Sequence, residues 1–358
     1  MPTFEVATPQ RTYSAVVERG GISRLPEFLS SGKLFVVTTQ DVLDLHGARL
    51  RSALGDREFE ILIFAGLEEN KRISHVERMA EQMVERGADR SSLVIAFGGG
   101  IVTDLAGFLA AIFMRGIPVI QIPTTLLAQV DAAVGGKTGA NLVAGKNLIG
   151  AFHQPLVVLI DPAVLSTLPE REYRAGLYEI IKTGVIASEP MFCLLEENAR
   201  DILAQDAAMV DHIIAESVRI KAEVVSSDER ESGLRRILNF GHTFGHALEA
   251  ETQYTRFLHG EAVSWGMRAA TYLARSLNIL KVDDSEAILT MLDVYGPIPS
   301  VKEIAPESLR ARLVKDKKTI QNRVHFVLPV KIGEVVVRAD IEEALVTRAI
   351  ENALADCQ

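Results

Sequence analysis

The sequence predicts an α/β, Rossmann-like nucleotide-binding domain at the N-terminus and a mostly α-helical domain at the C-terminus. Short runs rich in Val and Ile punctuate residues 1–161, whereas apolar residues recur at helical spacing after Pro162. The length of 358 residues, at roughly 150 per domain, also suits two domains. We therefore expect domains at 1–161 and 162–358, with the active site in the cleft between them.

Apolar runs indicate the elements of the first domain. Separated by helical stretches, such runs predict buried parallel strands at 33–39, 59–64, 92–100, 117–123 and 155–161. The segment 74–87 carries Val76, Met79 and Met83 at helical spacing and ends in Gly87. This pattern predicts a crossover helix with a glycine C-cap.

Helical periodicity indicates the elements of the second domain. It predicts helices at 169–186, 199–228, 233–250 and 260–280. Strand signals return only at 324–329 and 333–340, which together suggest a hairpin.

Composition and charge exclude several classes of protein. Hydrophobic residues at 48% and charged residues at 24% exclude a disordered or fibrous chain. The net charge of −9 argues against a nucleic-acid partner but permits a small anion in a locally basic pocket. Cys193 and Cys357 are too few for a disulfide scaffold or a cysteine-based metal site. Without a signal-peptide pattern or an apolar stretch of membrane-spanning length, we expect a cytoplasmic protein with no membrane partner.

Two glycine-rich segments suit phosphate binding. Gly98–Gly100 lies between a predicted strand and a helix, so its backbone can approach a pyrophosphate; the alternative is a tight turn without a ligand. Lys137 in GGKTG and Lys146 in GKN sit beside glycines, which leaves room for an ammonium to reach a phosphate. The alternative is a pair of solvated loop lysines. With three basic and two acidic residues, segment 98–153 has a local charge of +1.

A polar stripe distinguishes the predicted helix 233–250. Four residues fall at i, i+4, i+7 and i+11, on one helical face: Arg235, Asn239, His242 and His246. Buried polar groups need partners, and a solvated face would favour Lys and Glu, so we interpret the stripe as a site. Gly241 and Gly245 each cost about 1 kcal/mol in a helix, which indicates that something large approaches this surface.

Two further residues can complete a metal site with His242. Glu179 and His259 would make a set of three N/O ligands with an open position, as in catalytic zinc sites. The alternative is a capping histidine and a surface glutamate. Lys182 follows Glu179 by three residues on the same helical face, so a ligand and a substrate-holding cation can share one helix.

Five segments, taken in order, form a recognisable series: GGGIVTDLAGF, MRGIPVIQIPTTLLAQVDAAVGGKTGAN, GKNLIGAFHQP, AGLYEIIKTG and LNFGHTFGHALE. From about residue 60 to the DKK at 316–318, the chain resembles the 3-dehydroquinate synthase family of the sugar-phosphate cyclases. The resemblance implies an NAD-binding α/β domain, a helical domain that binds Zn²⁺ or Co²⁺, and a homodimer. It implies a lyase of the shikimate pathway of aromatic amino-acid biosynthesis. Its substrate would be a phosphorylated sugar acid, 3-deoxy-D-arabino-heptulosonate 7-phosphate, and its products 3-dehydroquinate and phosphate.

The resemblance also implies roles for particular residues. The implied metal ligands are Glu179, His242 and His259. The implied cofactor contacts are Glu68, Lys71, Gly99, Gly100, Asp104, Thr124, Thr125, Lys146 and Thr167. The implied substrate and catalytic contacts are Arg115, Asp131, Lys137, Asn147, Lys182, Lys221, Arg235, Asn239, His246 and Lys317. Glu231 is a further candidate for assisting proton transfer, with an ordinary solvated glutamate as the alternative.

The chain departs from the family pattern at three places. VVTTQD lacks the usual acidic residue after the first strand, so Thr39 or Asp41 would contact the adenosine ribose. GANL stands where many members have GVNH, and Thr183 follows the helix lysine where an aromatic residue is common. None of these changes touches the implied metal ligands.

The implied reaction is redox-neutral overall. Hydride transfer from the substrate's C5 to NAD⁺ makes the C6 proton acidic, so phosphate leaves; the hydride then returns, the ring opens and an aldol addition closes the carbocycle. Lys137, Lys182 and Lys317 would hold the phosphate. The alternatives are a metal- and NAD-dependent alcohol or glycerol dehydrogenase, a sister sugar-phosphate cyclase, and a non-catalytic NAD- and metal-binding module. A dehydrogenase does not need the phosphate-holding lysines, and GGKTG disfavours a sister cyclase.

Overall fold

The computed structural model describes residues 2–316 and 324–357, so Lys317 lies outside the described residues. Contacts divide the chain into two compact units, Met1–Pro169 with Val210–Arg230, and Glu170–Met209 with Glu231–Gln358. Val210–Arg230 is tied to the first unit by an Arg19–Asp211 ion pair of 2.6 Å and by the Ala7 N–H, which donates to Ser226 Oγ at 3.0 Å. The sequence-based boundary between residues 161 and 162 stays a prediction.

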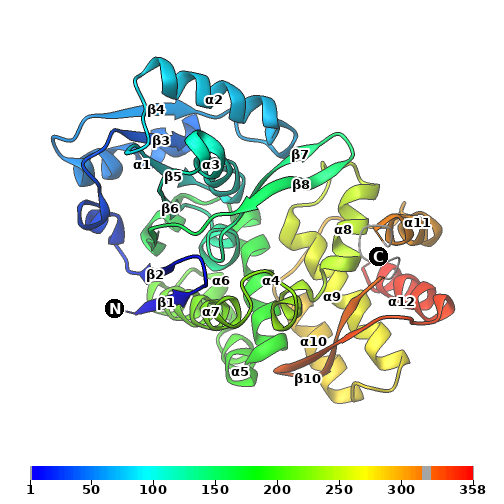
Figure 1. Cartoon of the computed structure of the whole chain (residues 1–358). Helices are drawn as coiled ribbons and strands as arrows, with labels where there is room; N and C mark the ends of the chain where they lie inside the picture. The colour runs from blue at the N-terminus through cyan, green and yellow to red at the C-terminus, as the bar shows by residue number, and fades with distance from the viewer. Residues whose placement is uncertain (1, 317–323, 358) are drawn as a thin grey trace. The chain divides into compact units, whose positions relative to one another are not determined.

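The first unit is built on a seven-stranded sheet of order β1-β2-β9-β6-β5-β3-β4 (Figure 1). Its strands are β1 (Thr3–Ala7), β2 (Thr12–Val17), β3 (Leu34–Thr38), β4 (Phe59–Ile63), β5 (Leu93–Gly98), β6 (Val119–Pro123) and β9 (Val157–Ile160). Neighbouring strands pair in parallel, except that β1 is antiparallel to β2. The five predicted parallel strands are confirmed as β3, β4, β5, β6 and β9.

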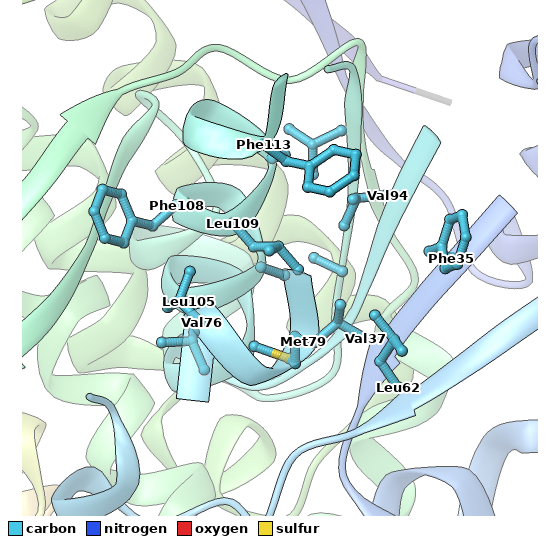
Figure 2. Close-up of a cluster of buried hydrophobic side chains, with 14 of the residues drawn as sticks. Phe35, Val37, Leu62, Val76, Met79, Val94, Leu105, Phe108, Leu109 and Phe113 are labelled. Carbon is cyan, nitrogen blue, oxygen red and sulfur yellow. The ribbon is translucent and has the colours of Figure 1, made fainter. Parts of the chain in front are cut away.

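Helices cover both faces of this sheet: α1 (Gln40–Leu54), α2 (Ile73–Glu85) and α3 (Gly100–Ile112). Successive residues of a strand point to opposite faces. Phe35 and Val37 of β3 therefore pack into one cluster with residues of α2 and α3 (Figure 2), whereas Val36 packs with Leu50 of α1 in the other cluster. Burial on both faces explains the uninterrupted apolar runs in the sequence.

The order of the strands reverses between β3 and β5. The chain continues from β3 outward to β4, then crosses back to β5 and proceeds to β6 on the other side. In open α/β sheets, ligands bind at the carboxyl ends of the strands at such a switch point. Because β5 ends at Gly98, the glycine turn Gly98–Gly100 lies at this position.

An antiparallel hairpin of β7 (Lys137–Leu142) and β8 (Gly145–Phe152) was not predicted from the sequence. Glycine and polar residues disfavour strands, so the sequence pattern predicts no strand in these segments. A Cβ on Gly150 would lie only 2.1 Å from the Thr138 carbonyl oxygen, so the two strands approach this closely because glycine is there. Lys137 and Lys146 consequently lie on strands and not on loops.

The second unit is mostly helical. Its helices are α4 (Glu170–Ala187), α5 (Glu189–Glu197), α6 (Ala199–Leu203), α8 (His242–Glu251), α9 (His259–Ser276), α10 (Val282–Val294), α11 (Pro306–Asp316) and α12 (Glu343–Asp356). Helix α9 is central and contacts α4, α8, α10 and α12 (Figure 1). The predicted helices 169–186 and 260–280 are confirmed, as is the hairpin, formed by β10 (Phe326–Lys331) and β11 (Glu334–Arg338). In the described part of the chain, no helix combines the length and apolar character needed to cross a membrane.

Two predicted helices are interrupted. The segment 199–228 forms α6 and α7 (Ala207–Ser227), with a break at Gln205, whose φ is 59°. The prediction of one helix over 233–250 is wrong, because a 3₁₀ helix, η6 (Leu234–Asn239), precedes α8, and Gly241 between them has a φ of 79°. Arg235 and Asn239 therefore do not share a helical face with His242 and His246.

The glycines of this segment also have a different role from the predicted one. A Cβ on Gly245 would lie 2.8 Å from the Ala262 carbonyl oxygen, and one on Gly266 would lie 1.9 Å from the Gly241 carbonyl oxygen. The partner that approaches closely is the backbone of α9. The glycines thus set the packing of α8 against α9 and are not evidence for a ligand.

Candidate active site

The turn between β5 and α3 presents backbone groups. Gly99 is the N-cap of α3, has no side-chain cap, and would place a Cβ only 3.0 Å from Thr125 Cγ2. The neighbouring Thr124 hydroxyl is buried and has no hydrogen-bond partner among the described residues. The start of α3 at Gly100 offers N–H groups that the helix itself does not use. This arrangement fits the phosphates of a nucleotide.

A network around Lys71 joins residues that are distant in the sequence. The buried Lys71 ammonium pairs with Asp104 and donates to Asn147 Oδ1 at 2.6 Å. Asn141 donates to Glu68 Oε1 at 2.7 Å and accepts from the Asn147 N–H at 2.8 Å. Burial raises the pKa of the Asp104 carboxyl, an effect that the Lys71 ammonium opposes. Three implied cofactor contacts and one implied substrate contact thus lie together, with Asn141 as a member that sequence reasoning missed.

The turn before Lys137 is held in place by side chains from two other segments. Gly135 and Gly136 have φ values of 105° and 66°, in the region that favours glycine. The Gly135 N–H donates to the Tyr13 hydroxyl at 2.9 Å, and a Cβ on Gly136 would lie 2.5 Å from the Gln154 side chain. Lys137 follows as the exposed first residue of β7, so the turn presents a cation on a defined backbone.

A second lysine of the first unit is buried. Lys221 on α7 pairs with the Asp131 carboxylate and also donates to the Asp131 carbonyl at 2.5 Å. Asp131 belongs to η4 (Ala128–Ala132), a single π-helical turn. Such turns occur frequently at functional sites. Lys146 is half-buried on β8.

Two other candidates lie at the ends of 3₁₀ helices: Arg115 in η3 (Phe113–Arg115) and Thr167 in η5 (Pro162–Thr167). Arg115 follows the C-terminal end of α3, and a helix of 13 residues places about 20 Å between its ends. It is exposed and has a φ of 72°. The Thr167 hydroxyl lies 2.9 Å from Nε2 of the buried His46. Burial lowers the pKa of His46.

In the second unit, a buried carboxylate faces two imidazoles. Glu179 of α4 is 1% exposed, and its Oε1 lies 3.8 Å from His242 Nε2 and 3.6 Å from His259 Nε2. These separations are too long for hydrogen bonds. Around a tetrahedral metal with bonds of about 2.0–2.1 Å, ligand atoms lie about 3.4 Å apart. Because Glu179 Oε1 is buried without a hydrogen bond in the described ranges, the donor set fits a divalent metal.

Lys182 and His246 border the same cluster. The Lys182 ammonium, 2% exposed, pairs with Glu179 Oε2, which confirms that the two residues share a helical face. His246 lies one turn after His242 on α8, and ligand atoms of His242, His246 and His259 all lie within 4.8 Å of one another. A cation and a third imidazole thus stand beside the candidate metal position.

Local contacts fix the starts of α9 and α8, the helices that carry His259 and His242. The Leu258 N–H donates to Glu261 Oε2 at 2.8 Å, a bond that caps α9 just before His259. Arg171 holds the same carboxylate with two bonds, of 2.7 and 2.8 Å. Before α8, the left-handed Gly241 turns the chain so that His242 begins the helix.

The segment before α8 holds the remaining candidates. Arg235 in η6 is 2% exposed, and its Nε makes no hydrogen bond among the described residues. Asn239 Nδ2 donates to Glu231 Oε1, and Glu231 has a φ of 60°. Sequence reasoning also missed Glu249 of α8, a buried carboxylate whose Oε2 lies 3.4 Å from His259 Nδ1. Glu249 lies seven residues, or about two helical turns, after His242, and this spacing is the sequence feature that could have identified it.

This architecture, a parallel sheet with a glycine turn and a helical unit with a Glu–His–His cluster, is similar to that of a class of solved synthases. 2-epi-5-epi-valiolone synthase from Streptomyces hygroscopicus subsp. jinggangensis 5008, with NAD⁺ and Zn²⁺ bound, is 30% identical, with a TM-score of 0.88 and 98% of each chain covered. 2-deoxy-scyllo-inosose synthase, complexed with carbaglucose-6-phosphate, NAD⁺ and Co²⁺, is 25% identical, with a TM-score of 0.89 and coverage of 98% of this chain and 99% of that chain.

Sequence comparison narrows this class. Residues 61–175 match the family model of the 3-dehydroquinate synthase N-terminal domain, and residues 176–319 match that of the C-terminal domain. The 3-dehydroquinate synthase of Solibacter usitatus (strain Ellin6076) is 65% identical over 357 residues, which cover 99% of this chain and 100% of that protein. The chain belongs to the 3-dehydroquinate synthase family.

Proposed function

We propose that this chain converts 3-deoxy-D-arabino-heptulosonate 7-phosphate to 3-dehydroquinate and inorganic phosphate, with NAD⁺ and a divalent metal, Zn²⁺ or Co²⁺. The observation that carries the proposal is the buried Glu179 Oε1, which faces the Nε2 atoms of His242 and His259 without a hydrogen bond in the described ranges. Membership of the family over nearly the whole chain supports the choice of substrate.

The cofactors would be held by residues of both units. Glu179, His242 and His259 would hold the metal. The backbone turn that would hold the NAD⁺ phosphates is formed by Gly99 and Gly100, with Thr124 and Thr125 beside it. The further contacts proposed for NAD⁺ are Glu68, Lys71, Asp104, Lys146 and Thr167. When bound, the metal supplies Lewis acidity toward a substrate hydroxyl, and NAD⁺ supplies a reversible hydride acceptor.

The chain's own side chains would bind the substrate and move its protons. We assign Lys137, Lys182 and Lys317 to the phosphate, because ammonium groups form charge-assisted hydrogen bonds with it. Arg235 and Asn239 would orient the carboxylate and hydroxyl end, and His246 would transfer protons near the C5 oxygen. The remaining proposed contacts are Arg115, Asp131, Asn147 and Lys221, with Glu231 assisting proton transfer.

Metal removal tests this proposal. The purified chain, given substrate and NAD⁺, should release phosphate; a chelator should stop the release, and added Zn²⁺ or Co²⁺ should restore it. Release that continues unchanged in the chelator would refute the metal assignment. No release under any of these conditions would refute the activity.

The alternatives are not favoured. A dehydrogenase acting on a simple polyol would accumulate NADH, and a sister cyclase would act on another sugar phosphate. We also propose a cytoplasmic homodimer. Sedimentation equilibrium, which measures the mass of the assembly in solution, tests the dimer against twice the 39.1 kDa chain mass.

A further inference from the structure

The buried carboxylate of Glu249 lies against one of the imidazoles assigned to the metal, and no role above uses it. We propose that Glu249 is a positioning residue: it holds the His259 imidazole with its proton on Nδ1 and its Nε2 lone pair toward the metal. This inference rests on the proposed function, because it takes His259 as a metal ligand.

The His259 ring lies between two buried carboxylates. Its Nδ1 is 3.4 Å from Glu249 Oε2, and its Nε2 is 3.6 Å from Glu179 Oε1. Glu249 and Glu179 are each 1% exposed. An ionised carboxylate only accepts hydrogen bonds, so the proton of the neutral imidazole lies on Nδ1. The Nε2 lone pair then faces Glu179.

His242 has the same arrangement with a different acceptor. Its Nδ1 lies 3.2 Å from the Phe240 carbonyl oxygen, and its Nε2 lies 3.8 Å from Glu179 Oε1. A carbonyl oxygen also only accepts, so this ring too turns its Nε2 lone pair toward Glu179. Both imidazoles thus expose the same nitrogen, but only the acceptor of His259 is a side chain that a substitution can change.

The burial of Glu249 supports a role at the metal. A buried carboxylate is costly unless it is paired, and a metal-bound imidazole offers it an N–H donor made more positive by the ion. Glu251, two residues further along α8, is different: its carboxylate is half-buried and accepts from Arg312 Nε at 2.9 Å. Glu251 therefore serves as a matched control on the same helix.

The first test is the affinity for Zn²⁺ alone, measured by competition with a chromophoric chelator. Loss of such an outer partner typically weakens metal binding by about 10- to 100-fold. We expect a loss in this range for Glu249→Ala, a smaller loss for Glu249→Gln, and wild-type affinity for Glu251→Gln. Wild-type affinity in both Glu249 variants would overturn the proposal. If Glu249→Ala does not fold, the isosteric Glu249→Gln decides.

The second test is the tautomer of His259 in the metal-free protein, read from the ¹⁵N chemical shifts of the ring. We expect the proton on Nδ1 in the wild type and in Glu251→Gln, and a shift toward the Nε2–H form in Glu249→Gln. An Nε2–H tautomer in the wild type would overturn the proposal. Because this readout needs neither turnover nor substrate, failure of the proposed reaction and failure of this inference are distinguishable.

Discussion

Replacing Gly266 by alanine should damage both the stability of the second unit and its metal site. Gly266 lies on α9 against the Gly241 carbonyl, just before α8. His242 directly follows Gly241, and His259 begins α9. The packing of these two helices therefore sets the distance between two proposed metal ligands.

The size of the effect follows from one contact. A Cβ on Gly266 would lie 1.9 Å from the Gly241 carbonyl oxygen, whereas a carbon and a carbonyl oxygen need about 3.3 Å. Both groups belong to the backbone, so the helices must separate by about 1.4 Å. Overpacking of this kind costs about 1–3 kcal/mol, partly offset by the helix propensity of alanine, which is worth about 1 kcal/mol over glycine. We expect a net loss of up to about 2 kcal/mol in the free energy of unfolding.

The metal site should respond more strongly than the fold, because metal ligation tolerates displacements of only about 0.2 Å. We expect Zn²⁺ to bind at least about tenfold more weakly, measured by chelator competition, with stability measured by urea unfolding. Gly47→Ala on α1 is the control, since its Cβ would meet only the flexible end of Leu43. Wild-type stability and Zn²⁺ affinity in Gly266→Ala would refute the reasoning.

Three further predictions concern single side chains. His242→Ala should lose bound Zn²⁺ and phosphate release together, as measured by metal analysis and a phosphate assay. Lys137→Ala should weaken substrate binding by about tenfold or more and leave NAD⁺ binding unchanged in calorimetry, since a charge-assisted hydrogen bond contributes about 1.5–3 kcal/mol. Burial lowers the pKa of His46 from its ordinary 6.5, so the folded state keeps this ring neutral. Its contribution to stability is full above pH 6.5 and is lost as the pH falls below that value, and His46→Gln should flatten this part of the urea-unfolding profile.

Each of these predictions has a contrary outcome. An active, metal-free His242→Ala enzyme would remove His242 from the ligand set. Equal losses of substrate and NAD⁺ affinity in Lys137→Ala would place this lysine elsewhere. An unchanged pH slope in His46→Gln would assign the acid sensitivity to other groups.

Local sequence pattern predicted five strands of the sheet but not β1, β2 or the β7–β8 hairpin. The β3, β5, β6 and β9 strands are buried on both faces, which leaves an uninterrupted apolar run in the sequence. β7 and β8 carry glycine where their backbones approach closely, as at Gly150 and Thr138. Strand propensities alone therefore predict a loop in these segments.

In the candidate site, too, local sequence pattern predicts contacts between residues that are close in the sequence but not those that depend on tertiary structure. Glu179 and Lys182 are three residues apart, so helical spacing predicted that they lie together. The break at Gly241 was not predicted, because its cause is the close approach of Gly266, a residue 25 positions later (266 − 241) on another helix. The Lys71, Asp104 and Asn147 contacts likewise depend on tertiary structure, and only the resemblance to a family singled out these residues.

Turnover with NAD⁺ far below the substrate concentration tests the central claim most directly. Phosphate release would be followed by ³¹P NMR and NADH by absorbance in the same sample of the metal-loaded protein. The proposed function predicts many phosphates released per NAD⁺, one 3-dehydroquinate formed for each phosphate, and no accumulation of NADH. Release that stops after one equivalent of NAD⁺, with NADH accumulating to match, would contradict it.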